Sequence, residues 1–157
     1  MKSRRRILRE KILQVLYAYE MQGSGLTEIM NDQLDKITNQ EELEFCKGSV
    51  NYIIANRNEI NKTIEDHLLN WKVDRIAVVD RLLLQIGIGE MQYSEDIPPK
   101  VTINEIIDIA KEFSTAKSGK FINGILDVIL IEFKQDGKLK KTGRGLIENT
   151  LGKKSEE

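Results

Sequence analysis

The chain has 157 residues, 40% of them hydrophobic and 31% charged, with a formal net charge of −1. This length supports one domain with a substantial core, and the balanced charge excludes a protein that attracts polyanions through its total charge alone. The single cysteine, Cys46, excludes an intrachain disulfide and a cysteine metal cluster, and its apolar neighbours predict a buried, unreactive thiol.

Charge is unevenly distributed along the chain. Residues 1–11 carry six Lys or Arg against one Glu, whereas residues 27–46 carry six acids. Local patches of this kind decide binding partners better than the total charge does. No segment has the length of a membrane span or the pattern of a signal peptide, so we expect a cytoplasmic protein that does not associate with membranes.

The first predicted helix begins after Ser3, a good N-cap, and places a cluster of arginines in its first turns. Apolar residues follow at the spacing of one helical face: Leu8, Ile12, Val15, Leu16 and Tyr19. Arginine is unfavourable at the positive end of the helix dipole, so the cluster suggests a role in binding a polyanion.

Further helices are predicted in chain order. Thr27 caps a helix to Ile37, and a long amphipathic pattern from Leu43 to Leu68 breaks near Asn56. Trp71 lies at a junction before a helix that Asp74 caps and that ends near Tyr93; this segment is apolar on nearly all sides, which is typical of a central helix.

The C-terminal third continues the helical pattern. A Thr102–Glu105 capping box opens a helix to Phe113, and Ser118 caps a last long helix. Gly87 and Gly89 are expected to admit a neighbouring helix closely. The sum is an all-α, compact bundle of six or seven helices, with a domain over residues 1–134 and a Lys/Gly-rich, disordered tail over residues 135–157.

Catalytic chemistry is poorly represented in the sequence. His67 is the only histidine and lies beside two leucines, which is typical of a structural role. No glycine-rich loop follows a strand in the way a phosphate-binding loop requires. We therefore expect a protein that is not an enzyme and that needs no cofactor or metal.

Two segments together could grip a nucleic acid. One is the arginine cluster, and the other is the start of the last helix, where lysines, a serine hydroxyl and backbone N–H groups can meet a phosphate while an aromatic ring offers a stacking face to a base. The candidate RNA-binding residues are Arg4, Arg5, Arg6, Arg9, Tyr17, Lys117, Ser118, Lys120 and Phe121. Structural roles compete with this interpretation: Ser118 as an N-cap, Phe121 as a core residue and Tyr17 as a half-buried one.

Several segments in order resemble the family of the bacterial transcription antitermination factor NusB. The resemblance covers residues 3–133 and is densest in two blocks, Ile103-Asn104-Glu105 and Phe121-Ile122-Asn123-Gly124-Ile125-Leu126-Asp127. It implies an all-helical fold of two small helical subdomains. It also implies binding of single-stranded boxA RNA from ribosomal RNA transcripts together with NusE, within an RNA polymerase antitermination complex.

The resemblance places Asp80 and Arg81 near the RNA and NusE surfaces. Carried over by position, it assigns RNA contacts to Arg5, Arg6, Arg9, Tyr17, Ser118, Lys120 and Phe121. Lys117 stands where relatives can carry an acid, which predicts added attraction to phosphate here. Two alternatives stay open: a helical adaptor that binds an acidic protein, and an RNA-binding module of a ribosomal RNA modification system. Whether the free protein is a monomer or a homodimer also stays open.

Overall fold

A computed structural model describes residues 1–69 and 72–146. The described residues form seven α-helices and two short 3₁₀ turns. The helices are α1 (Arg4–Gln22), α2 (Leu26–Gln33), α3 (Gln40–Ala55), α4 (Arg57–Glu65), α5 (Val78–Tyr93), α6 (Pro99–Phe113) and α7 (Ala116–Gln135); the turns are η1 (Val73–Arg75) and η2 (Gly143–Leu146). This confirms the all-α prediction for the described part of the chain.

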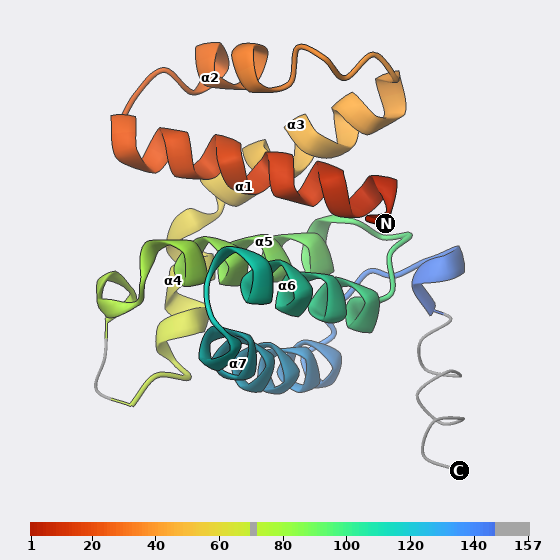
Figure 1. Ribbon diagram of the computed structural model, residues 1–157. Coiled ribbons are helices and arrows are strands. Elements are labelled where there is room, and N and C mark those ends of the chain that lie inside the picture. Colours follow the sequence, from red (N-terminus) through yellow and green to blue (C-terminus); the bar gives the residue numbers. More distant parts are fainter. Residues whose placement is uncertain (70–71, 147–157) are drawn as a thin grey trace.

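The helices form two groups that share one core. Figure 1 shows α1, α2 and α3 together at the top and α5, α6 and α7 together below, with α4 descending from the first group to the second. Helix α5 contacts α1 and α3 on one side and α6 and α7 on the other. The two predicted subdomains are therefore joined by a single hydrophobic cluster that extends across α5.

The central position of α5 follows from its sequence. Residues 82–91 are all buried, including Gln85 and Glu90. Its two glycines allow close packing, as predicted: a Cβ at Gly87 would lie 3.0 Å from Leu126 Cδ1 of α7, and a Cβ at Gly89 would lie 2.7 Å from Ile53 Cγ1 of α3. Any larger residue at Gly89 would push α3 away from α5.

Four of the predicted helix boundaries are confirmed, among them the ends of α5 at Tyr93 and of α6 at Phe113, whereas the end predicted at Ile37 is wrong because α2 ends at Gln33. The Ser3 side chain accepts a hydrogen bond from the Arg6 N–H, at 3.1 Å, and so caps α1. The predicted break at Asn56 separates α3 from α4, and the Asn56 side chain donates to the carbonyl of Tyr52 at the end of α3. The predicted junction at Trp71 lies outside the described residues.

Four predicted helix starts are wrong, and in each case the helix begins at another residue nearby. Helix α2 begins after Gly25, whose left-handed φ of 76° suits glycine, so Thr27 lies inside the first turn. Helix α6 begins at Pro99, which needs no N–H partner there, so Thr102 becomes an interior residue. The helix predicted from Arg75 starts at Val78, because Asp74 lies in η1 and Ile76 is extended.

The start of α7 is the fourth correction and bears on the candidate site. The Thr115 side chain accepts a hydrogen bond from the Ser118 N–H, at 3.0 Å, so Thr115 rather than Ser118 is the N-cap. The Ser118 hydroxyl is thereby left for another partner.

The segment after α7 folds back on the domain. Lys141 Nζ donates to the Ser94 carbonyl at 2.5 Å and Thr142 N–H donates to the Glu95 carbonyl at 2.9 Å, both just beyond α5. Gly145 is buried. The predicted disorder therefore does not hold for residues 136–146, and the rest of the tail lies outside the described residues.

Candidate nucleic-acid interface

The three arginines of the first turn of α1 point to three different surroundings. Arg4 donates two hydrogen bonds to the Glu42 carboxylate of α3, at 2.8 and 2.9 Å. The Arg5 guanidinium lies over the Phe45 ring, 4.1 Å from its centroid. Arg6 faces α6. Because successive residues of a helix point in different directions, the three guanidinium groups do not form one positive patch.

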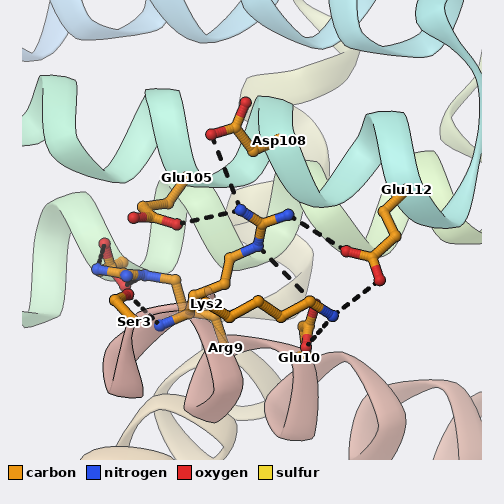
Figure 2. A network of polar contacts seen from close by, with 9 residues as sticks. Lys2, Ser3, Arg9, Glu10, Glu105, Asp108 and Glu112 are labelled. Atoms are coloured by element: carbon orange, nitrogen blue, oxygen red, sulfur yellow. Dashed lines mark hydrogen bonds and ion pairs between the residues drawn. The ribbon is translucent and has the colours of Figure 1, made fainter.

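Arg6 and Lys2 sit in a network of carboxylates, which Figure 2 shows from close by. Lys2 Nζ lies 2.8 Å from both Glu10 Oε1 and Glu112 Oε1. The Arg6 guanidinium lies 3.4 Å from Glu112 and 3.8 Å from each of the other three carboxylates, those of Glu10, Glu105 and Asp108. Two cations thus meet four carboxylates, and the network as a whole is acidic.

The pKa shifts agree with this geometry. The hydrogen bonds that the Lys2 ammonium donates to the Glu10 and Glu112 carboxylates raise the pKa of Lys2, and the one to Glu112 lowers the pKa of that carboxyl. The hydrogen bond from Arg4 likewise lowers the pKa of Glu42. The Glu42 and Glu112 carboxylates are therefore ionised near neutral pH and serve as counter-charges for Arg4 and Lys2.

Arg9 is a structural residue in this fold. It is 2% exposed, and its guanidinium donates to both oxygens of the buried Glu90 carboxylate, at 2.7 and 3.1 Å. The Thr102 hydroxyl donates to the same carboxylate. The side chain predicted to contact RNA thus joins α1, α5 and α6 in the interior, where no ligand reaches it.

Ser118 and Asp80 form a second buried pair. The Ser118 hydroxyl donates to Asp80 Oδ2 at 2.7 Å, and both residues are less than a tenth exposed. The pair joins the start of α7 to the start of α5. Ser118 was predicted to meet RNA and Asp80 to meet a partner protein, but in this structure each side chain meets the other.

Arg81 is also engaged within the protein. Its guanidinium donates to Glu20 Oε1 at 2.8 Å, and Glu20 also pairs with Arg57 at 3.7 Å. Arg81, which was predicted to lie near a partner protein, is therefore bonded within the chain where α1, α4 and α5 meet.

Two exposed lysines of the predicted site are on α7. Lys117 and Lys120 are exposed, and among the described residues neither has a hydrogen-bond or ion-pair partner. Phe121 is half-buried and lines two adjoining hollows. One, of about 220 Å³, lies against Asp80, Lys117 and Ser118; the other, of about 590 Å³, extends along α7 past Lys120.

Tyr17 is 44% exposed on α1, so its ring is accessible for a contact with a base. Its position differs from that of Arg9, which occupies the same helix but faces the core. The RNA contact of Tyr17 was predicted from the family resemblance, since the residues by themselves indicated a half-buried ring.

The structure links the two predicted segments through α6. Lys2 contacts Glu112 and lies 5.8 Å from the Phe113 ring centroid at the end of α6, and the Ser114 hydroxyl then lies 2.9 Å from that of Ser118. Arg4 and Arg5 lie instead against α3. The structure therefore divides the predicted arginine cluster between the α6 side and the α3 side of α1.

Sequence reasoning missed the carboxylates of α6. Glu105, Asp108 and Glu112 recur at helical spacing on one face, a pattern visible in the sequence. Their partners lie a hundred residues away on α1, and that pairing requires the tertiary structure.

Among residues 1–69 and 72–146, no group of three or more His, Cys, Asp or Glu side chains has an arrangement that could hold a metal ion. In the same part of the chain, no helix is both long enough and apolar enough to cross a membrane.

Comparisons with known proteins agree with this architecture. The NusB family model matches residues 6–130. Two relatives, both transcription antitermination protein NusB, are 42% identical over 146 residues in Chloroherpeton thalassium and 39% identical over 148 residues in Salinibacter ruber. Each match covers 92% of this chain, with 69% and 92% of the respective relative.

Solved structures give the same result. NusB of T. maritima is 36% identical, with a TM-score of 0.76 over 82% of this chain and 92% of that one. A chain from a complex of the antitermination factors NusB and NusE with dsRNA is 29% identical, with a TM-score of 0.73 over 80% of this chain and 94% of that one. Because family model, relatives and structures all extend over most of the helical domain, this chain belongs to the NusB family.

Proposed function

We propose that this chain is a transcription antitermination factor that binds boxA-type single-stranded RNA of ribosomal RNA transcripts together with NusE. In this role it joins the RNA polymerase antitermination complex and suppresses premature termination. The helical domain of residues 1–134 carries the binding surface. The role needs no catalytic step, and it places the protein in the cytoplasm with the transcribing polymerase.

One observation carries the RNA-binding part of the proposal. Lys117 and Lys120 are exposed on the first turns of α7, beside the half-buried ring of Phe121, and neither pairs with any residue that the structure describes. Lysines beside a helix N-terminus attract phosphate, and an aromatic ring next to them can stack on an unpaired base. A protein of the same family has been solved with NusE and dsRNA, which supports NusE and an RNA as partners.

The structure narrows which predicted residues would touch the RNA. Lys117, Lys120, Phe121 and Tyr17 have accessible side chains and are proposed as direct contacts. Arg4 and Arg5 are accessible on the α3 side and are proposed as phosphate contacts there. Arg9, Ser118 and Asp80 would support these contacts by fixing the helices that carry them.

A binding titration tests the proposal. The full chain is titrated with a boxA-type RNA and with a scrambled RNA of equal length, each with and without NusE. We expect tighter binding to the boxA-type strand and a further gain when NusE is present. Equal affinity for both strands, with strong salt dependence, would instead favour a sequence-blind polyanion contact, and the absence of RNA binding would favour the protein-binding adaptor.

A further inference from the structure

The cations of the α1 N-terminus differ in how tightly the protein holds them. Arg9 is buried and doubly bonded to Glu90, at 2.7 and 3.1 Å. The Arg6 side chain is 16% exposed and meets the α6 carboxylates at 3.4 to 3.8 Å, and the two outer ones, Asp108 and Glu112, are 55% and 43% exposed. Long, partly exposed ion pairs contribute little free energy, so Arg6 can exchange partners at low cost whereas Arg9 cannot.

Two polar atoms of this network lack a hydrogen bond. Arg6 Nε and Glu105 Oε2 are both buried and have no hydrogen-bond partner among the described residues. A guanidinium forms its best contacts as a planar fork with two oxygens of one anion, which no carboxylate of α6 supplies here. Arg6 is therefore held by charge but not fully satisfied.

Lys2 lies at the outer edge of the network and its Nζ, unlike Arg6 Nε, is hydrogen-bonded to its carboxylates. The Lys2 side chain is 40% exposed and its Nζ bridges Glu10 and Glu112, and the Glu112 side chain is itself 43% exposed. A phosphate oxygen could replace the Glu112 carboxylate without entering the core. The network also ends at the last turn of α6, which leads directly to Thr115 and the exposed Lys117.

We propose that Asp108 and Glu112 of α6 restrain RNA binding, because they hold Arg6 and Lys2 in competition with RNA phosphate. The inference rests on the proposed function and deepens it. RNA that contacts the start of α7 would displace the carboxylates, take over these two cations and extend the bound surface from α7 to α1. The affinity for RNA would thus be set below the value that the cations alone would give.

Neutral replacements of the two exposed carboxylates test this. In the full chain, Asp108→Asn with Glu112→Gln is expected to raise the affinity for boxA-type RNA by roughly threefold to tenfold, the effect of one or two exposed charge pairs. The matched control is Asp32→Asn with Asp35→Asn. It removes two exposed carboxylates, one in the last turn of α2 and one just after that helix. We expect the control to change the affinity by less than about twofold.

A double-mutant cycle separates release of the cations from a general gain in positive charge. In a Lys2→Gln, Arg6→Gln background the α6 substitutions should no longer raise the affinity. A gain that persists in this background, or no gain in the native background, would overturn the inference. If circular dichroism shows that the Lys2→Gln, Arg6→Gln protein is unfolded, the cycle is measured instead with Lys2→Gln and Glu112→Gln, singly and combined.

The outcomes also separate this inference from the proposed function. A native chain that binds boxA-type RNA while the α6 variants bind it equally well refutes the restraint alone. A native chain and variants that all fail to bind RNA refute the proposed function, and the restraint with it.

Discussion

Arg9 of α1 and Glu90 of α5 form a buried ion pair in which the guanidinium donates to both carboxylate oxygens, at 2.7 and 3.1 Å. Both side chains are 2% exposed, and the Thr102 hydroxyl completes the site from α6. The pair joins the two groups of helices at the centre of the fold. A charge that the sequence pattern assigned to RNA thus belongs to the architecture.

Removing this arginine should destabilise the fold. We expect Arg9→Ala to lower the free energy of unfolding by about 3–5 kcal/mol, because it leaves the Glu90 carboxylate buried without its counter-charge. Urea denaturation followed by circular dichroism measures the change. Arg4→Ala, in which an exposed pair is lost, is the control and should leave the transition midpoint nearly unchanged. An Arg9→Ala protein of native stability but weakened RNA binding would contradict the structural role.

The Ser118–Asp80 hydrogen bond should contribute to stability in the same way. We expect Ser118→Ala to cost about 1–3 kcal/mol, because Asp80 Oδ2 loses its donor while Oδ1 already lacks a partner among the described residues. Thermal or urea unfolding tests this, with Ser114→Ala as a nearby hydroxyl deletion. If Ser118→Ala unfolds like the native chain and yet binds RNA more weakly, the hydroxyl acts on RNA directly.

The exposed lysines of α7 should affect RNA binding without affecting stability. We expect Lys117→Gln and Lys120→Gln each to weaken binding of boxA-type RNA and to reduce the slope of log affinity against log salt by about 0.7, the value for one phosphate contact on a single strand. Lys117→Glu should weaken binding further, because it places an acid beside the phosphate. Lys36→Gln, an exposed lysine at the end of α2, is the control. An unchanged affinity and salt slope in Lys117→Glu would exclude this part of α7 from the interface.

His67 should make stability depend weakly on pH. Burial lowers the pKa of His67, but hydrogen bonds to the Thr63 carbonyl and the Glu132 carboxylate outweigh it, so its pKa is raised above the usual value of about 6.5. A raised folded-state pKa adds stability that is complete below the unfolded pKa and is lost as pH rises through the folded one. We therefore expect the unfolding free energy to fall modestly as pH rises above about 6.5.

The control for this dependence is Glu132→Gln, which keeps the side-chain shape and removes the charge that favours protonated His67. Unfolding curves between pH 6 and pH 8.5 should show a smaller pH dependence in this variant. An identical pH dependence in both proteins would assign the effect to other groups.

Cys46 should be protected from thiol reagents. It is fully buried, its thiol contacts the Leu8 carbonyl at 3.9 Å, and burial raises its pKa to about 11. We expect alkylation at pH 8 to be slow in the native protein and fast in denaturant, as measured by mass spectrometry. Rapid labelling of the native chain would show that α1 and α3 separate readily.

The helices themselves were largely predictable, because their signals are local. The apolar spacing of α1, the cap at Ser3 and the break at Asn56 each depend on residues within a few positions of one another. The errors at Thr102 and Ser118 were also local in kind. Helix α6 begins at Pro99 and Thr115 caps α7. The hydroxyls of Thr102 and Ser118 instead donate to Glu90 and Asp80 on α5.

Periodicity and motif spacing are properties of the chain, so the helical fold, the family and the basic segment of α1 could be inferred from the residues alone. The role of each charge could not, because it depends on tertiary packing. Arg9 pairs with Glu90 inside the core, Arg6 meets the acidic face of α6, and Lys117 stays exposed. The reason is physical: the partner of a charged side chain depends on which distant segments packing brings within a few ångströms, and on how much water remains there.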